Sequence, residues 1–168
     1  MNLCINVYSE PGKGTTFKVF LPRIEQEAAE KTKEAVQAIP TGDERILFID
    51  DEESLVKLGE QMLERLGYQV KTRTSSIETL AAFQDHPDEY DLVMTDMTMP
   101  NMTGEILAKE LLRVRSDIPI IIYTGFSYQM DKEKALGMGI RAFVMKPYVV
   151  RDVAETIRKV LDPEKGDE

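Results

Sequence analysis

The feature that most constrains the fold is a regular alternation of short β-branched runs with longer amphipathic stretches between residues 44 and 162. Strands that are apolar on both sides need cover on both faces, and strands separated by helices are usually joined in parallel. The sequence therefore predicts an α/β domain in which helices flank a five-stranded parallel sheet. The expected strands are residues 46–50, 69–74, 91–96, 119–124 and 141–146.

Helix signals fill the stretches between these strands. The first stretch places Leu58 and Leu63, among other apolar residues, on one side and ends at Gly67, the residue type that most often follows a helix C-terminus. The second opens with Ser75 and Glu78 at capping-box spacing. We expect the apolar stripes of these helices, Leu58 included, to pack against the sheet.

Polar side chains stand where four of the expected strands end. Asp50 and Asp51 end the first strand, Asp96 the third, Thr124 the fourth and Lys146 the fifth. An open parallel sheet binds its ligands outside the carboxyl ends of its strands. We therefore expect these side chains to meet at one edge of the sheet.

Three carboxylates at one edge repel one another, so the site needs either raised pKa values or a cation. Oxygen ligands of this kind suit Mg²⁺. With a metal and Lys146 offsetting charge, Asp96 could attack phosphorus while Thr124 donates a hydrogen bond to the transferring group. An Asp-Asp pair alone is more often a turn or a helix cap, so the prediction depends on the whole set.

Four segments carry a resemblance to a known family: ILFIDDEE (46–53), VMTDMTMPNMTG (93–104), IIIYTG (120–125) and FVMKPY (143–148). Together they resemble the receiver domain of bacterial response regulators over roughly residues 44–162. The resemblance implies a flavodoxin-like (βα)5 fold with strand order 2-1-3-4-5. It also implies a phosphoacceptor in two-component signal transduction that takes its phosphoryl group from a phosphohistidine.

The resemblance further assigns roles to single residues. Asp96 would be the phosphoacceptor, and Asp51 would bind Mg²⁺ directly. Asp50 would bind the metal through water or an outer contact, and Asp96 and the backbone carbonyl of Thr98 would complete the protein ligands.

The same resemblance places three residues around the incoming phosphoryl group and its readout. Thr124 and Lys146 would contact the phosphoryl group, and Phe143 matches the aromatic whose rotation follows the movement of the threonine. The Lys146–Pro147 bond resembles a cis peptide of the family. We expect the partner to be a histidine kinase or a histidine phosphotransfer protein, and the changing face to be the helix at 127–137 and the fifth strand. Such a receiver catalyses its own phosphorylation and slow dephosphorylation.

Two alternatives remain at the level of the sequence. One is a haloacid-dehalogenase-like phosphatase, which also uses a strand-end Asp with Mg²⁺. That pattern needs a second Asp two residues after the first, whereas Met97 and Thr98 follow Asp96 and leave no general acid. The other alternative is an interaction module that works without phosphorylation.

The N-terminal stretch VYSEPGKGTTFKVFLP (7–22) predicts a β-hairpin. Alternating apolar residues flank a glycine-rich turn, and the order of Gly, Lys and Thr does not match a nucleotide-binding Walker loop. The amino-acid sequence of residues 2–22 resembles the final hairpin of the ATP-binding domain of sensor histidine kinases. The resemblance implies a remnant that binds no ATP, at the tail of a hybrid histidine kinase.

We therefore expect four parts. Residues 1–23 are the hairpin remnant, 24–43 a linker with high helix propensity, 44–162 the receiver domain and 163–168 a tail. A lone two-stranded hairpin with an apolar face is marginal in water. It must dock on the receiver, pair with a second copy or remain mobile, and we favour pairing with a second copy, which would give a homodimer.

Charge and composition exclude several other classes of function. The net charge of −9 disfavours direct binding of nucleic acid phosphates. No apolar run reaches the length of a membrane span and no secretory signal opens the chain, so we expect a cytoplasmic location without membrane contact. The single cysteine, Cys4, fits a reducing compartment, and the single histidine, His86, rules out a multi-histidine metal site.

Overall fold

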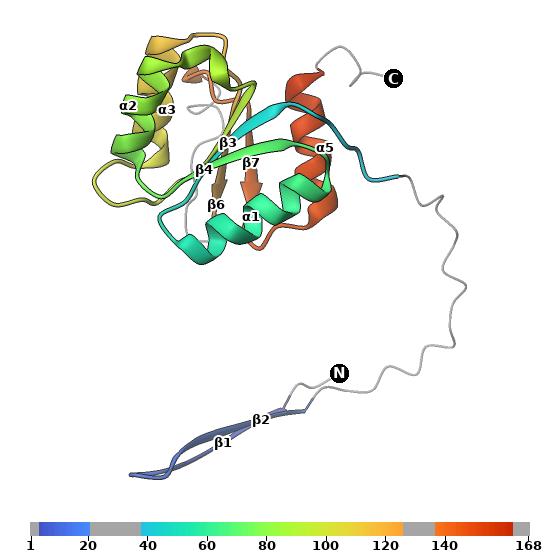
Figure 1. The fold of residues 1–168 in the computed structure, drawn as a ribbon. Helices are drawn as coiled ribbons and strands as arrows, with labels where there is room; N and C mark the ends of the chain where they lie inside the picture. The colour runs from blue at the N-terminus through green and yellow to red at the C-terminus, as the bar shows by residue number, and fades with distance from the viewer. Residues whose placement is uncertain (1–3, 21–37, 126–136, 163–168) are drawn as a thin grey trace. The chain divides into compact units, whose positions relative to one another are not determined.

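The computed structural model describes residues 4–20, 38–125 and 137–162. The chain divides into two units, residues 1–37 and residues 38–168 (Figure 1). The predicted linker (24–43), helix (127–137) and tail (163–168) lie mostly or wholly outside the described residues.

The first unit contains the predicted hairpin. Strand β1 (Cys4–Glu10) pairs antiparallel with β2 (Gly14–Phe20). Ile5 lies opposite Val19 and Val7 lies opposite Phe17, so these four side chains share one face. Each of the four is more than half exposed.

The second unit contains a five-stranded parallel sheet in the order β4-β3-β5-β6-β7. This is the predicted order 2-1-3-4-5, and each strand lies within one residue of its predicted bounds. The strands β5 and β6 are apolar on both sides and buried at every position. The expectation that all five strands are covered on both faces was wrong for the edge strand β4, whose polar residues Gln69 and Lys71 are exposed. The strands are β3 (Arg45–Ile49), β4 (Gln69–Arg73), β5 (Leu92–Asp96), β6 (Ile120–Thr124) and β7 (Ala142–Met145).

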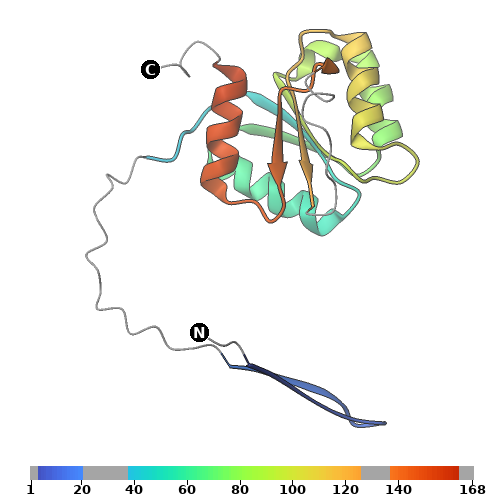
Figure 2. The same ribbon diagram turned by 180° about the vertical axis from the view of Figure 1, so that it is seen from behind.

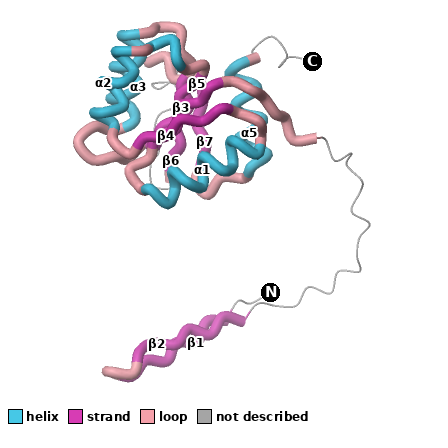
Figure 3. Tube along the Cα trace, in the orientation of Figure 1, coloured by secondary structure: helices cyan, strands magenta, loops and turns pink. Residues whose placement is uncertain are grey.

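Helices cover both faces of the sheet. Helices α1 (Glu53–Arg65) and α5 (Val150–Leu161) lie on one face, and α2 (Ser76–Asp85) and α3 (Gly104–Val114) lie on the other (Figures 1 and 2). Figure 3 shows the same layers by secondary structure. A short 3-10 helix, Pro87–Glu89, leads into β5. Within the described ranges, no helix combines the length and the apolar character needed to cross a membrane.

Two apolar cores fill the layers. Leu107 and Leu111 of α3 pack with Ile120 and Ile122 on one side of the sheet. Ile157 of α5 packs on the other side with residues such as Phe48. Because alternate residues of a strand point to opposite faces, β6 contributes to both cores.

One expectation about α1 was wrong. Leu58 is 54% exposed, and the buried positions of α1 are Val56, Gly59 and Leu63. The reason is the close approach of the helix to the sheet at Gly59, where a Cβ would lie 2.4 Å from the ring of Phe48. This contact turns the Val56 side of the helix toward the sheet and leaves Leu58 in solvent.

The predicted caps are confirmed. Gly67 follows α1 with a φ of 97°, the left-handed conformation that glycine adopts without a steric penalty. The Ser75 hydroxyl accepts a hydrogen bond from the backbone N–H of Glu78 at the start of α2. These caps fix the chain on either side of β4.

Candidate functional site

Asp50, Asp96 and Lys146 meet at the carboxyl edge of the sheet. Asp50 follows β3, Asp96 ends β5 and Lys146 follows β7, so the parallel strands deliver all three to the same edge. The ammonium of Lys146 lies 3.0 Å from Asp50 Oδ2 and 2.8 Å from Asp96 Oδ1. Asp50 is 1% exposed and Asp96 6%, so both carboxylates are held away from solvent.

The second oxygen of each carboxylate accepts a hydrogen bond from the backbone. The N–H of Glu52 donates to Asp50 Oδ1 at 2.9 Å, and the N–H of Thr98 donates to Asp96 Oδ2 at 2.6 Å. Buried charges are stable only when they are paired and hydrogen-bonded in this way. The two loops after β3 and β5 therefore fix both carboxylates, and each turns its other oxygen toward Lys146.

The pKa of Lys146 reflects this pairing. Burial by itself lowers the pKa of the ammonium, but hydrogen bonds to Asp96 and Asp50 outweigh the burial and raise it above its usual value. Lys146 is therefore charged throughout the physiological pH range. A fixed positive charge beside Asp96 is what a transferring phosphoryl group requires.

Tyr123, which belongs to none of the predicted site residues, packs beside this cluster. Its ring stacks on Phe48 with centroids 5.0 Å apart and meets Tyr148 edge-on at 5.8 Å. Its hydroxyl donates a hydrogen bond of 2.5 Å to the carbonyl of Ile49, and Lys146 Nζ lies 4.8 Å from the ring centroid. Burial raises the pKa of the Tyr123 phenol, so the hydroxyl stays protonated as a donor.

The remaining predicted site residues differ in exposure. Thr124 is 4% exposed and its hydroxyl lies 3.4 Å from the carbonyl oxygen of Gly125. Phe143 is partly buried and packs against the core under α2 and α3. Asp51 and Thr98 are exposed. The structure thus brings Asp50, Asp96 and Lys146 into contact and places Asp51 on the solvent side. The Lys146–Pro147 peptide is cis, as expected.

Gly104 closes the back of the site. A Cβ at this position would lie 2.1 Å from the carbonyl oxygen of Asp96. Its N–H donates to the carbonyl of Met97, and the hydroxyl of Thr103 caps α3 by accepting from the N–H of Ile106. Only glycine lets α3 begin so close to the end of β5.

The donor set fits a hard divalent cation in its chemistry. Asp50, Asp96 and Asp51 supply carboxylate oxygens, the ligands that Mg²⁺ prefers. In residues 4–20, 38–125 and 137–162, however, no three His, Cys, Asp or Glu side chains come close enough together to hold a metal ion as they stand. Lys146 pairs with both Asp50 and Asp96, and its single positive charge offsets only one of their two negative charges, so a metal would have to share their oxygens with the ammonium.

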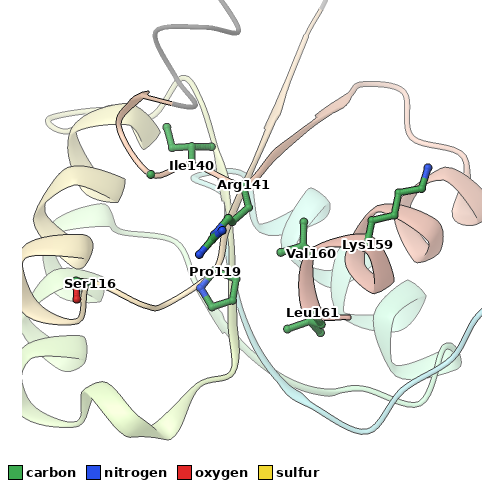
Figure 4. Close-up of a pocket in the computed structure, with 8 residues that line it drawn as sticks. Ser116, Pro119, Ile140, Arg141, Lys159, Val160 and Leu161 are labelled. Atoms are coloured by element: carbon green, nitrogen blue, oxygen red, sulfur yellow. The ribbon is translucent and has the colours of Figure 1, made fainter. Parts of the chain in front are cut away.

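A separate cavity of about 610 Å³ lies at the opposite edge of the sheet (Figure 4). Pro119 and Arg141 precede β6 and β7, and Lys159 and Leu161 end α5. In Figure 4 the side chain of Lys159 points away from Arg141. None of the residues that line the cavity belongs to the cluster of Asp50, Asp96 and Lys146.

The part of the chain that carries this site matches a known protein family. A family model described as the response regulator receiver domain matches residues 46–158. The chain belongs to the response regulator receiver family. The match favours the receiver interpretation over the phosphatase alternative, and it covers the strand ends that carry Asp50, Asp96 and Lys146.

Two sensor proteins are relatives over nearly the whole chain. The sensor kinase CckA of Brucella abortus (strain 2308) is 32% identical over 162 residues, which cover 92% of this chain and 17% of that protein. The aerobic respiration control sensor protein ArcB of Escherichia coli (strain K12) is 30% identical over 168 residues, covering 98% and 21%. The chain spans about a fifth of the length of these relatives. Matches that extend beyond the receiver agree with a receiver from a hybrid kinase.

Solved receiver structures share the fold. A response regulator receiver domain protein from Clostridium thermocellum is 30% identical with a TM-score of 0.68, covering 73% of this chain and 97% of that one. A CheY-like receiver domain protein from Methanospirillum hungatei JF-1 is 29% identical with a TM-score of 0.65, covering 76% and 100%. The fold of the second unit is therefore that of a receiver domain.

Proposed function

We propose that this receiver accepts a phosphoryl group on Asp96 from a phosphohistidine. The observation that carries the proposal is the buried contact of 2.8 Å between Lys146 Nζ and Asp96 Oδ1. A carboxylate held in place by the N–H of Thr98 and set beside a permanent positive charge is prepared for nucleophilic attack on phosphorus.

In the proposed step, a carboxylate oxygen of Asp96 forms a bond to phosphorus while the bond between phosphorus and the donor's imidazole nitrogen breaks. The electron pair of that bond leaves with the imidazole, which gains a proton from solvent. Lys146 lies where it can compensate the negative charge of the transferring oxygens. The hydroxyl of Thr124, at the end of the neighbouring strand β6, would donate to one of them.

Mg²⁺ fits this proposal because it would neutralise the carboxylates and the phosphoryl oxygens together. The residues that would hold it are Asp51, Asp50, Asp96 and the backbone carbonyl of Thr98. Asp51 is exposed beside the buried Asp50, so it can turn toward an incoming ion without a large rearrangement of the core.

The proposed partner is a histidine kinase or a histidine phosphotransfer protein, in the cytoplasm. Phosphorylation would draw Thr124 toward the phosphoryl group and let the partly buried Phe143 move, which changes a protein-binding face. The proposed parts are a hairpin remnant (1–23), a linker (24–43), the receiver (44–162) and a tail (163–168). We also propose that the hairpin pairs with a second copy.

The test is intact mass after incubation with Mg²⁺ and acetyl phosphate as a small phosphodonor. The native chain should gain a single phosphoryl group, and Asp96→Asn should gain none. Asp85→Asn, at the exposed end of α2, is the matched control and should be labelled like the native chain. Equal labelling of Asp96→Asn and the native chain would exclude Asp96 as the acceptor.

A further inference from the structure

Tyr123 links the candidate site to the core beneath it. It is 0% exposed, lies in register with Asp96 on the neighbouring strand and donates its hydroxyl to the carbonyl of Ile49. Because β5 separates β6 from β3, this hydrogen bond crosses a whole strand. Ile49 directly precedes Asp50, so Tyr123 contacts the backbone that carries one carboxylate. Its ring also lies beside Lys146, the lysine that pairs with both carboxylates.

We propose that Tyr123 is a positioning residue that holds the ammonium of Lys146 between Asp50 and Asp96. This inference deepens the proposed phosphoacceptor function and rests on it. The lysine makes the ion pairs with both carboxylates, and the ring of the tyrosine acts through the lysine. The hydroxyl of Tyr123 has a separate contact with Asp50, which only a variant that keeps the ring can isolate.

The ring is placed to act on the lysine by attraction between a cation and an aromatic face. Lys146 Nζ lies 4.8 Å from the ring centroid, within the distance at which such attraction is significant. A lysine side chain is flexible, and that of Lys146 is 25% exposed, so it has an alternative in solvent. Attraction to the ring favours the position of the ammonium between the carboxylates over its position in solvent.

The ring is itself fixed on several sides. Phe48 stacks on it with an interplanar angle of 9°, and Tyr148 packs edge-on at 86°. The hydroxyl is anchored at Ile49. Because the ring is fixed by its neighbours, it can restrict the flexible side chain of Lys146.

The proposal has a consequence for magnesium. Lys146 and a divalent cation draw on the same oxygens, Asp50 Oδ2 and Asp96 Oδ1. If the ring strengthens the hold of the lysine, it also makes the lysine a stronger competitor of the metal. Loss of the ring should therefore raise the affinity for Mg²⁺ and, at saturating Mg²⁺, slow the labelling of Asp96 because the lysine is less well placed. Loss of a residue needed only for packing would lower both the affinity for Mg²⁺ and the rate of labelling.

The experiment measures Mg²⁺ affinity by calorimetric titration without phosphodonor, and labelling by acetyl phosphate at saturating Mg²⁺. The variants are Tyr123→Leu and Tyr123→Met, the second because methionine fills irregular space and is better tolerated in a core. We expect Mg²⁺ to bind about threefold more tightly and labelling to slow by a similar factor, the range that ring–cation attraction supports. Tyr123→Phe, which keeps the ring, should recover most of both differences.

Two controls separate positioning from packing. Tyr90→Leu removes another buried ring that stacks on an aromatic, Phe83, and should not produce opposite shifts. In a Lys146→Met background, Tyr123→Met and Tyr123→Phe should have equal Mg²⁺ affinity, because both lack the hydroxyl that contacts Asp50 and the lysine on which the ring acts is gone.

The outcomes are decisive in both directions. The proposal would be overturned if Mg²⁺ affinity and labelling rate both fell in Tyr123→Leu and Tyr123→Met, or if neither changed. It would also be overturned if loss of the ring changed Mg²⁺ affinity equally with and without Lys146. A native chain that binds Mg²⁺ but is never labelled would refute the phosphoacceptor function, while the Mg²⁺ titrations would still decide whether Tyr123 acts through Lys146.

Discussion

The ammonium of Lys146 lies 2.8 Å from the carboxylate of Asp96, although the strands that carry the two residues are separated by β6. The same ammonium reaches Asp50 at 3.0 Å, so one lysine joins the ends of β3, β5 and β7. The charge of the lysine is therefore the central feature of this edge of the sheet, and its removal gives the most direct test of the site.

Replacing Lys146 by methionine should slow the labelling of Asp96 by acetyl phosphate about a hundredfold at saturating Mg²⁺, the usual cost of removing one group that stabilises a developing charge. Methionine keeps most of the unbranched apolar stem of the lysine and removes the ammonium, with its charge and its hydrogen-bond donors. Time-resolved intact mass provides the rate. Lys159→Met, on the exposed side of α5 at the other edge of the sheet, is the control and should label normally. Native-like labelling of Lys146→Met would show that the charge is dispensable.

Replacing Gly104 by alanine should destabilise the second unit by about 3 kcal/mol, because the new methyl group would overlap the carbonyl of Asp96 and neither backbone can move freely. Urea unfolding measures the free energy. Gly137→Ala provides the comparison, since a Cβ there meets nothing within 4 Å and the change should stay within about 0.5 kcal/mol. Equal stability of the two variants would mean that α3 can shift away from β5 at little cost.

The strands were predictable because short β-branched runs alternate with amphipathic stretches, which is typical of a parallel sheet covered by helices. Their order came from the resemblance to receiver domains. The meeting of Asp50, Asp96 and Lys146 follows from that topology. The exposure of Leu58 did not follow, since it depends on the contact between Gly59 and Phe48, two residues on different elements. A one-dimensional apolar pattern does not contain such a contact.

Tyr123 was missed for a related reason. In the sequence it is one apolar position in the run IIIYT, and its ring fits a buried strand without further meaning. Its role depends on the carbonyl of Ile49 and the ammonium of Lys146, which come from strands on either side. A hydroxyl within a fully buried run was the available signal, because a buried phenol needs a hydrogen-bond partner.

Replacing Asp91 by asparagine should destabilise the fold by about 1 kcal/mol at neutral pH, a value limited by the solvent exposure of the ion pair. Both carboxylate oxygens of Asp91 accept from the guanidinium of Arg45, at 2.9 and 2.7 Å. The hydrogen bonds from Arg45 hold the pKa of Asp91 below its usual value.

The sign of the pH dependence follows from that shift. A carboxyl group with a depressed pKa in the folded state stabilises the fold above its unfolded pKa, about 3.9, and loses this contribution as the pH falls through the folded value. The difference in unfolding free energy between native chain and Asp91→Asn should thus shrink as the pH falls below the unfolded pKa and through the lower folded pKa. Urea unfolding at several pH values measures it, with Asp85→Asn for comparison. A difference that stays constant down to acid pH would contradict this account.

The hairpin of β1 and β2 exposes its apolar side chains. Ile5, Val7, Phe17 and Val19 form one apolar face, and each is more than half exposed, with Phe17 at 68%. An isolated two-stranded sheet with such a face gains stability by covering it, and a second copy supplies a matching surface.

Phe17→Ser should therefore weaken self-association of the full chain about tenfold or more, since it removes a large aromatic from the centre of that face. Tyr8 provides a matched control, because it is 63% exposed but lies on the opposite face, where its alternate position along β1 places it. Sedimentation velocity over a range of concentrations measures the association. A native chain that stays monomeric at every concentration would exclude pairing through the hairpin, and equal weakening by Phe17→Ser and Tyr8→Ser would show that the two faces are not distinguished.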